Sequence, residues 1–166
     1  MTNAEGTAIK IKPATDHDFG VVQDLIVAVG LAPSKANLSA TPDNSTYWIA
    51  WDGSKPIGVL GLEHGDGASL LRSAAVLPEW RGRGVGRALA RSALTYASLR
   101  GDRAVYLFSS GAGGYWRKFD FRQVPVAELA AILPNAPQVV SGVTRGWIDA
   151  EVAWRLSLAT SEAVAC

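Results

Sequence analysis

Cysteine and histidine are scarce in this 166-residue sequence. It has one cysteine, Cys166, at the last position, and two histidines, His17 and His64, which lie far apart. A single thiol forms no internal disulfide and no cysteine metal cluster. The two histidines lack the spacing of metal ligands and are typical of surface or capping residues. We therefore expect no bound metal, and a cytoplasmic location follows most simply.

Long apolar runs and an excess of charge of one sign are also lacking. No stretch reaches the length of a membrane span, and residues 1–10 lack the apolar core of a signal peptide. The formal net charge is only +1, whereas nucleic-acid-binding domains usually carry a basic excess on one face. We expect neither a membrane nor a nucleic acid as a partner. With 48% hydrophobic residues, the chain suits one compact domain over residues 1–166.

A basic, glycine-spaced segment stands out between the apolar run 70–76 and the amphipathic run 88–99. Its residues are Arg81, Gly82, Arg83, Gly84, Val85, Gly86 and Arg87. Glycines allow close backbone approach, and a helix that begins here would point its N–H groups at an anion. The arginines favour a pyrophosphate over a single carboxylate. A solvated turn or a weak nucleic-acid patch is the alternative, but the strand-loop-helix context favours an anion loop. A P-loop is disfavoured, since no Gly-Lys-Ser/Thr closes the motif.

The remaining pattern alternates strands and helices. Asp52-Gly53 and residues 64–67 are hairpin signals, and Thr15 is a candidate N-cap for a helix that Gly30 ends. Residues 135–150 are the least readable segment. The expected strands are Ala8–Ile11, Tyr47–Trp51, Pro56–Glu63, Ser69–Val76, Ala104–Ser109, Phe121–Val124 and Glu151–Leu158, and the expected helices are residues 19–29, Ala88–Leu99, Tyr115–Phe119 and Ala127–Leu133.

Two motifs in this order resemble a known family. Arg81 to Ala88 is similar to the pyrophosphate loop Gln/Arg-x-x-Gly-x-Gly/Ala of the GNAT superfamily of N-acetyltransferases, and Gly113 to Val124 resembles the second GNAT signature. The resemblance covers about residues 9–125. It implies a mixed α/β (α+β) fold: a mostly antiparallel central sheet of about six to seven strands, with helices on both faces and a splay between strands four and five.

The resemblance also implies acetyl-CoA as co-substrate and assigns residues to it. The pyrophosphate would lie on the loop 81–87, and the pantetheine arm would bind the backbone of Ala74, Ala75 and Val76. The splayed partner strand would be residues 105–109. Trp116 would pack against the cofactor or the core. The first helix and the segment 31–38 would border the acceptor site.

The usual acid and base of the family are missing from their places. Trp116 matches the position often filled by a tyrosine that protonates the leaving thiolate, and Leu70 matches a position often filled by a glutamate. Glu63, Ser109 and Tyr115 are therefore the candidate catalytic residues. Alternatively, catalysis rests on positioning of the reactants, with water chains relaying the proton, or the chain binds acyl-CoA without turnover. We favour catalysis by positioning together with a contribution from these candidate residues.

Arg72 and Ser73 are the candidate substrate-binding residues. Strand alternation places Leu70, Arg72, Ala74 and Val76 on one face, so Arg72 would point to the acceptor side if Leu70 does. A guanidinium there could clamp a carboxylate or phosphinate. A salt bridge from Arg72 to Glu63 is an equally favoured alternative.

The wider sequence pattern around Arg72 is similar to two GNAT groups: short amino-acid N-acetyltransferases of the acetylglutamate-synthase type, and arsenic-resistance-associated N-acetyltransferases. We therefore expect acetylation of a small amino acid or an amino-acid-like xenobiotic by direct transfer. The alternatives are a protein or peptide N-acetyltransferase and a catalytically silent acyl-CoA-binding module. The acceptor's identity, the role of residues 135–150 and the oligomeric state stay open, with a homodimer as one alternative.

Overall fold

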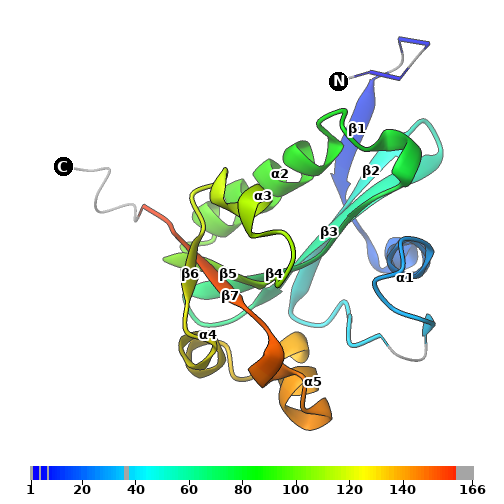
Figure 1. The fold of residues 1–166 in the computed structure, drawn as a ribbon. Coiled ribbons are helices and arrows are strands. Elements are labelled where there is room, and N and C mark those ends of the chain that lie inside the picture. The colour runs from blue at the N-terminus through cyan, green and yellow to red at the C-terminus, as the bar shows by residue number, and fades with distance from the viewer. Residues whose placement is uncertain (1, 4, 7, 36–37, 160–166) are drawn as a thin grey trace. The chain divides into compact units, whose positions relative to one another are not determined.

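The computed structural model describes residues 2–3, 5–6, 8–35 and 38–159 (Figure 1). Cys166 and residues 36 and 37 of the segment 31–38 lie outside the described residues. No helix in the described ranges has both the length and the apolar character needed to span a bilayer. In chain order the strands are β1 (Ile9–Pro13), β2 (Ser45–Asp52), β3 (Lys55–His64), β4 (Ala68–Val76), β5 (Ala104–Phe108), β6 (Arg122–Val124) and β7 (Ala153–Ser157). The α-helices are α1 (Phe19–Ala28), α2 (Val85–Leu99), α3 (Gly113–Arg117), α4 (Val126–Ile132) and α5 (Pro137–Arg145).

The strands form one seven-stranded sheet in the order β1-β2-β3-β4-β5-β7-β6. β4 and β5 pair in parallel, whereas β1 with β2, β5 with β7, and β6 with β7 pair antiparallel. The parallel ladder joins Ala68–Leu71 to Ala104–Leu107, and β4 continues to Val76. The predicted mixed, mostly antiparallel sheet is confirmed.

The chain forms two compact units, which we describe separately. The first unit comprises Met1–Leu62 and Ser73–Ala93, and the second comprises Glu63–Arg72 and Leu94–Cys166. The chain passes from one unit to the other inside β3, β4 and α2. The single domain expected over residues 1–166 stays a prediction.

In the first unit, the two faces of β3 pack against different helices. Val59 belongs to a core cluster with Val22, Leu25 and Ile26 of α1. On the opposite face, a Cβ at Gly58 would lie 3.1 Å from Leu89 Cδ1 of α2. This glycine therefore lets α2 approach the strand closely.

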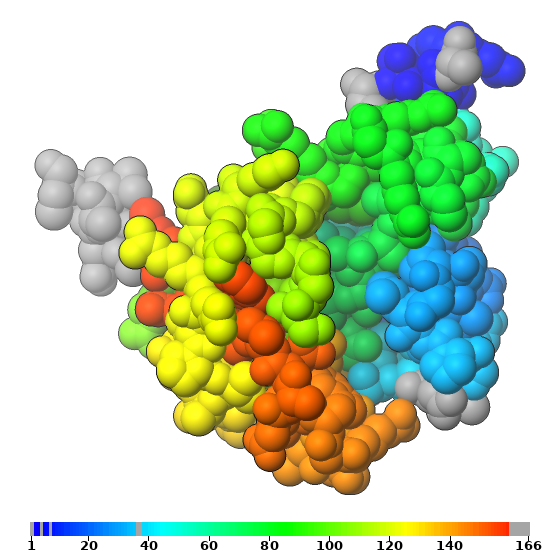
Figure 2. All heavy atoms as spheres, viewed as in Figure 1, coloured from blue at the N-terminus to red at the C-terminus, as the bar shows by residue number. Residues whose placement is uncertain are grey.

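In the second unit, α4 and α5 cover one face of β4, β5 and β7. Their buried side chains meet Leu70, Tyr106 and Ala153 in one core cluster. α5 lies at the surface of this unit (Figure 2), where Val140 and Val143 are exposed. The core residues that the two helices contribute to this cluster are Leu129 and Val139.

The helix α5 lies within residues 135–150, where no element was expected. It begins at Pro137 and is followed by Gly146 with φ +78°. Proline at the first helical position and a left-handed glycine just after the last are ordinary helix signals. They are visible in the sequence, but the exposed Val140 and Val143 weaken the apolar periodicity that would have identified the helix.

The side-chain alternation expected along β4 does not extend beyond Arg72. Ser73 has φ +55°, a left-handed conformation that interrupts the pleat. Ala75 packs against the core of the first unit, whereas Ala74 is exposed. The expectation that Ala74 and Val76 continue the face of Leu70 and Arg72 is therefore wrong, since alternation requires an uninterrupted extended backbone.

Candidate functional site

The loop between β4 and α2 is an exposed basic segment tied to the end of β4. The Nε of Arg81 donates a hydrogen bond to the carbonyl oxygen of Val76 at 3.1 Å. The guanidinium of Arg83 lies 5.0 Å from the ring centroid of the buried Trp80. These contacts anchor two of the three arginines. Residues 81–84 are all exposed, as a loop that receives a ligand requires.

The backbone of this loop suits an anion. Gly82 and Gly84 have φ +75° and +83°, and a Cβ on either would meet nothing within 4 Å. The carbonyl of Gly84 accepts the N–H of Ala88 at 3.0 Å, so α2 begins here and its first-turn N–H groups have no acceptor within the helix. The first turn carries no acidic residue. Arginines at the positive end of a helix dipole are unfavourable unless an anion joins them.

The other residues expected at the cofactor differ in their exposure to solvent. Val85 is buried at 1% exposure, so it contributes backbone to the loop while its side chain secures the helix start. Arg87 is exposed, and Gly86 is half-buried. Ala75 and Val76 are half-buried, and the carbonyl of Val76 already accepts Arg81. The assignment of the pyrophosphate to the loop and of the pantetheine arm to the strand end stays a prediction.

Glu63 and Arg72, in the second unit, form a buried ion pair. Nη1 of Arg72 donates to Oε2 of Glu63 at 2.9 Å, and their side chains are 8% and 0% exposed. Oε1 of Glu63 accepts the backbone N–H of Gln138, the second residue of α5, at 2.9 Å. Both carboxylate oxygens thus have partners. Of the two alternatives for Arg72, the salt bridge to Glu63 is present.

The Glu63 carboxyl has a perturbed acidity. Burial raises its pKa above the usual value, while Arg72 and the Gln138 N–H act in the opposite direction. A carboxyl with a raised pKa is a better proton acceptor than an ordinary one. Its complete burial means that it acts first on Arg72, whose guanidinium it orients. Its role as a catalytic base stays a prediction.

The candidates Ser109, Tyr115 and Trp116 lie around α3 of the second unit. Oγ of Ser109 accepts the N–H of Ala112 at 3.1 Å, just before the helix. The Tyr115 side chain is exposed at 41%, whereas Trp116 is 6% exposed and packs against Phe121 with a centroid distance of 5.6 Å. Trp116 is therefore a core residue of this unit, and its contact with the cofactor stays a prediction.

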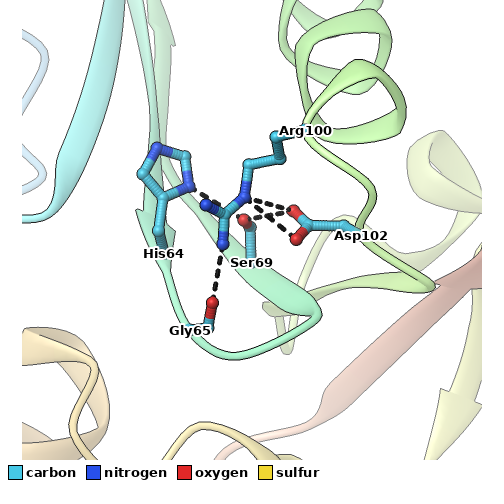
Figure 3. Close-up of polar contacts among 5 residues, drawn as sticks. All are labelled: His64, Gly65, Ser69, Arg100 and Asp102. Atoms are coloured by element: carbon cyan, nitrogen blue, oxygen red, sulfur yellow. Dashed lines mark hydrogen bonds and ion pairs between the residues drawn. The ribbon is translucent and has the colours of Figure 1, made fainter.

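A second polar cluster joins His64, Ser69, Arg100 and Asp102 (Figure 3). The Ser69 hydroxyl donates to Asp102 at 2.6 Å and lies 2.9 Å from Nδ1 of His64. Arg100 donates to both Asp102 oxygens at 2.9 and 3.0 Å and to the carbonyl of Gly65 at 2.6 Å.

This cluster is structural. Ser69 is fully buried and gives its proton to a carboxylate, whereas a nucleophilic serine gives it to a histidine. The hydrogen bonds instead hold the β3–β4 turn to the residues before β5. Sequence reasoning treated His64 as a surface or capping residue and missed the cluster, because Ser69 and Asp102 are 33 residues apart.

Comparisons with known proteins give a family match over part of the chain and a shared fold. Residues 43–123 match the profile of the family described as "Acetyltransferase (GNAT) domain". No curated protein sequence matches the chain.

Several solved structures share the fold at low sequence identity. A GNAT-family acetyltransferase from Staphylococcus aureus Mu50 has 15% identity and TM-score 0.68, over 92% of this chain and 100% of its own. Rv2747 of Mycobacterium tuberculosis, solved with CoA and a second ligand, has 15% identity and TM-score 0.68, over 90% and 99%. N-acetylglutamate synthase of Neisseria gonorrhoeae, complexed with coenzyme A and N-acetyl-glutamate, has 16% identity and TM-score 0.71, over 92% of this chain and 36% of its own.

The profile match spans the glycine loop and the second signature, and the fold around them is the one these structures share. By this match, residues 43–123 of the chain form a GNAT acetyltransferase domain, of a family that uses acetyl-CoA as acetyl donor.

Proposed function

We propose that this enzyme acetylates the amino group of a small molecule that carries a carboxylate, an amino acid or an amino-acid-like xenobiotic. The observation that carries the proposal is the buried Arg72 guanidinium, held by Glu63 at 2.9 Å. An orienting carboxylate on one side leaves a guanidinium pre-organised to bind a second oxyanion.

The electrostatics of the pair favour a zwitterion over a simple acid. Arg72 is the partner that reaches solvent, because its side chain is 8% exposed and that of Glu63 is not exposed. A carboxylate would therefore approach the guanidinium, while the negative Glu63 behind it attracts a positive group on the same ligand. The N-acetylglutamate synthase structure with bound N-acetyl-glutamate supports an acceptor of this class.

On the donor side, we assign the pyrophosphate of acetyl-CoA to the loop. The loop would supply backbone N–H groups and positive charge to the pyrophosphate through Arg81, Gly82, Arg83, Gly84, Val85, Gly86 and Arg87. The backbone of Ala74, Ala75 and Val76 would hold the pantetheine arm. The roles expected for Ser73 at the acceptor and for Trp116 at the cofactor stay predictions.

The reaction is direct transfer. The neutral amine attacks the thioester carbonyl, a C–N bond forms, the C–S bond breaks, and CoA leaves as thiolate while the amine loses one proton to water or to a base. Tyr115, with its exposed side chain, and Ser109 are the proposed proton donors to the thiolate. Glu63 is the proposed acceptor of the amine proton, through water.

The test is CoA release with a panel of free amino acids, amino-acid analogues and peptides, with the acetylated product identified by mass spectrometry. We expect turnover of one or more free amino acids and little with their decarboxylated amines, which lack the group that Arg72 binds. Equal rates with and without the carboxylate would contradict the proposal.

Two alternatives give different results in this test. A protein or peptide N-acetyltransferase would turn over peptides in preference to free amino acids. A catalytically silent acyl-CoA-binding module would bind acetyl-CoA and turn over no amine. The absence of a tyrosine at position 116 favours this alternative. The proposal places the enzyme in the cytoplasm with its donor.

A further inference from the structure

The side chain of Gln138 carries a buried polar atom that has no hydrogen-bond partner among the described residues. This atom is Oε1, which is inaccessible to solvent. The backbone N–H of the same residue donates to Glu63 Oε1 at 2.9 Å. Gln138 is thus directly beside the Glu63–Arg72 pair, and the contact with Glu63 uses its main chain only.

An unpartnered amide oxygen in a buried position is unfavourable. Buried polar atoms almost always have a hydrogen-bond partner, and one that does not costs free energy that a suitable ligand recovers. An amide oxygen is an acceptor only, so its complement is a donor such as an N–H group. The neighbouring Arg72 has donors only and suits a carboxylate.

We infer that Gln138 is a specificity-determining residue of the acceptor site, whose Oε1 accepts a hydrogen bond from the amino group that is acetylated. The inference rests on the proposed function and adds a residue and a division of labour to it. Arg72 binds the carboxylate of the acceptor, and Gln138 binds its amine. It also gives α5 a role: the helix presents Gln138, and Glu63 holds the helix start in place through the N–H of that residue.

The test compares ligands that differ only in the amine. Affinities for L-glutamate and for glutarate, its des-amino analogue, are measured by calorimetry in the presence of CoA; L-alanine and propionate form a second, smaller pair. The variant is Gln138→Met, which keeps side-chain length and the backbone N–H that Glu63 needs. Val143→Met is the matched control, since it places the same side chain on an exposed position of α5, 62% accessible in the wild type.

We expect Gln138→Met to weaken binding of the amino acid about tenfold and of its des-amino analogue less than about twofold, the size of one lost hydrogen bond to a charged group. Val143→Met should change neither. Arg72→Lys should weaken both members of a pair alike, because the carboxylate is common to them.

Equal losses for both members of a pair in Gln138→Met, or no loss, would overturn the inference, as would a wild type that binds neither amino acid. Failure of the proposed function looks different. In that case CoA release is absent with every amine, or is independent of the carboxylate, whatever residue occupies position 138.

Discussion

Arg72 and Glu63 show how one pair of residues combines a structural and a recognition role. Each is almost entirely buried, and each compensates the charge of the other at 2.9 Å. A buried ion pair adds little net stability, since desolvation offsets the attraction, but the loss of one partner strands the other. Substitutions at this pair therefore change the stability of the fold as well as the acceptor affinity.

The first prediction concerns this pair. Arg72→Ala should lower the free energy of unfolding by about 3–5 kcal/mol, because Glu63 is left buried without its counter-charge. Urea unfolding followed by circular dichroism measures the loss. The double variant Arg72→Met with Glu63→Gln removes both charges and should be clearly more stable than Arg72→Ala. A single variant as stable as the wild type would show that the carboxylate does not depend on Arg72.

At the scale of elements, the glycine loop and α2 act together, since the loop backbone sets the direction of the first helical N–H groups. Gly84 is one of the two loop glycines with a left-handed backbone. Its φ of +83° is one that L-residues adopt at a cost of about 1–2 kcal/mol. Its carbonyl also begins the helix by accepting Ala88 N–H.

The second prediction is that Gly84→Ala lowers affinity for acetyl-CoA at least tenfold, because the loop must shift to relieve the strained φ and its N–H groups then miss the pyrophosphate. Gly53→Ala is the matched control: Gly53 also has positive φ, +59°, and open space at its Cβ, but it lies in the β2–β3 turn. Fluorescence titration with acetyl-CoA measures the affinity of each variant. Similar affinities for both variants would argue against the loop as the cofactor site.

Elements with a strong local signal were predicted, and those without one were not. The turn at Asp52 and Gly53 and the apolar periodicity that includes Leu89 and Ala97 encode their structures locally, so β2, β3 and most of α2 were expected. The helix α5 has clear end signals at Pro137 and Gly146 but a weak apolar stripe. The left-handed Ser73 has no local signal, since serine rarely adopts φ +55°.

For the whole molecule, we expect stability to depend on pH through His64 of the polar cluster in Figure 3. Burial, aided by the nearby Arg100, lowers the pKa of His64 below its usual 6.5, and Asp102 opposes this only in part. At pH values between the lowered pKa of the folded state and 6.5, the unfolded chain therefore binds more protons at His64 than the folded chain does. The stabilisation is present above pH 6.5 and is lost as pH falls below it.

The third prediction follows from that sign. The stability of the wild type relative to His64→Asn, whose amide nitrogen can replace Nδ1 as donor to Ser69, should decrease as the pH falls from about 7.5 to 5.5. Urea unfolding at several pH values measures the difference, in which His17 cancels because both proteins contain it. A difference that is constant with pH would mean that His64 does not titrate in this way.

The sequence by itself indicated the family and the fold class and predicted the donor loop, because each depends on residues close together in the chain. The glycines at 82, 84 and 86 and the segment after Gly113 signal their backbone conformations locally. Only the tertiary structure decided that Arg72 is paired with Glu63 and that Gln138 joins them. Glu63 and Gln138 are 75 residues apart, and no local pattern encodes a contact that exists because the folded chain buries both ends of it.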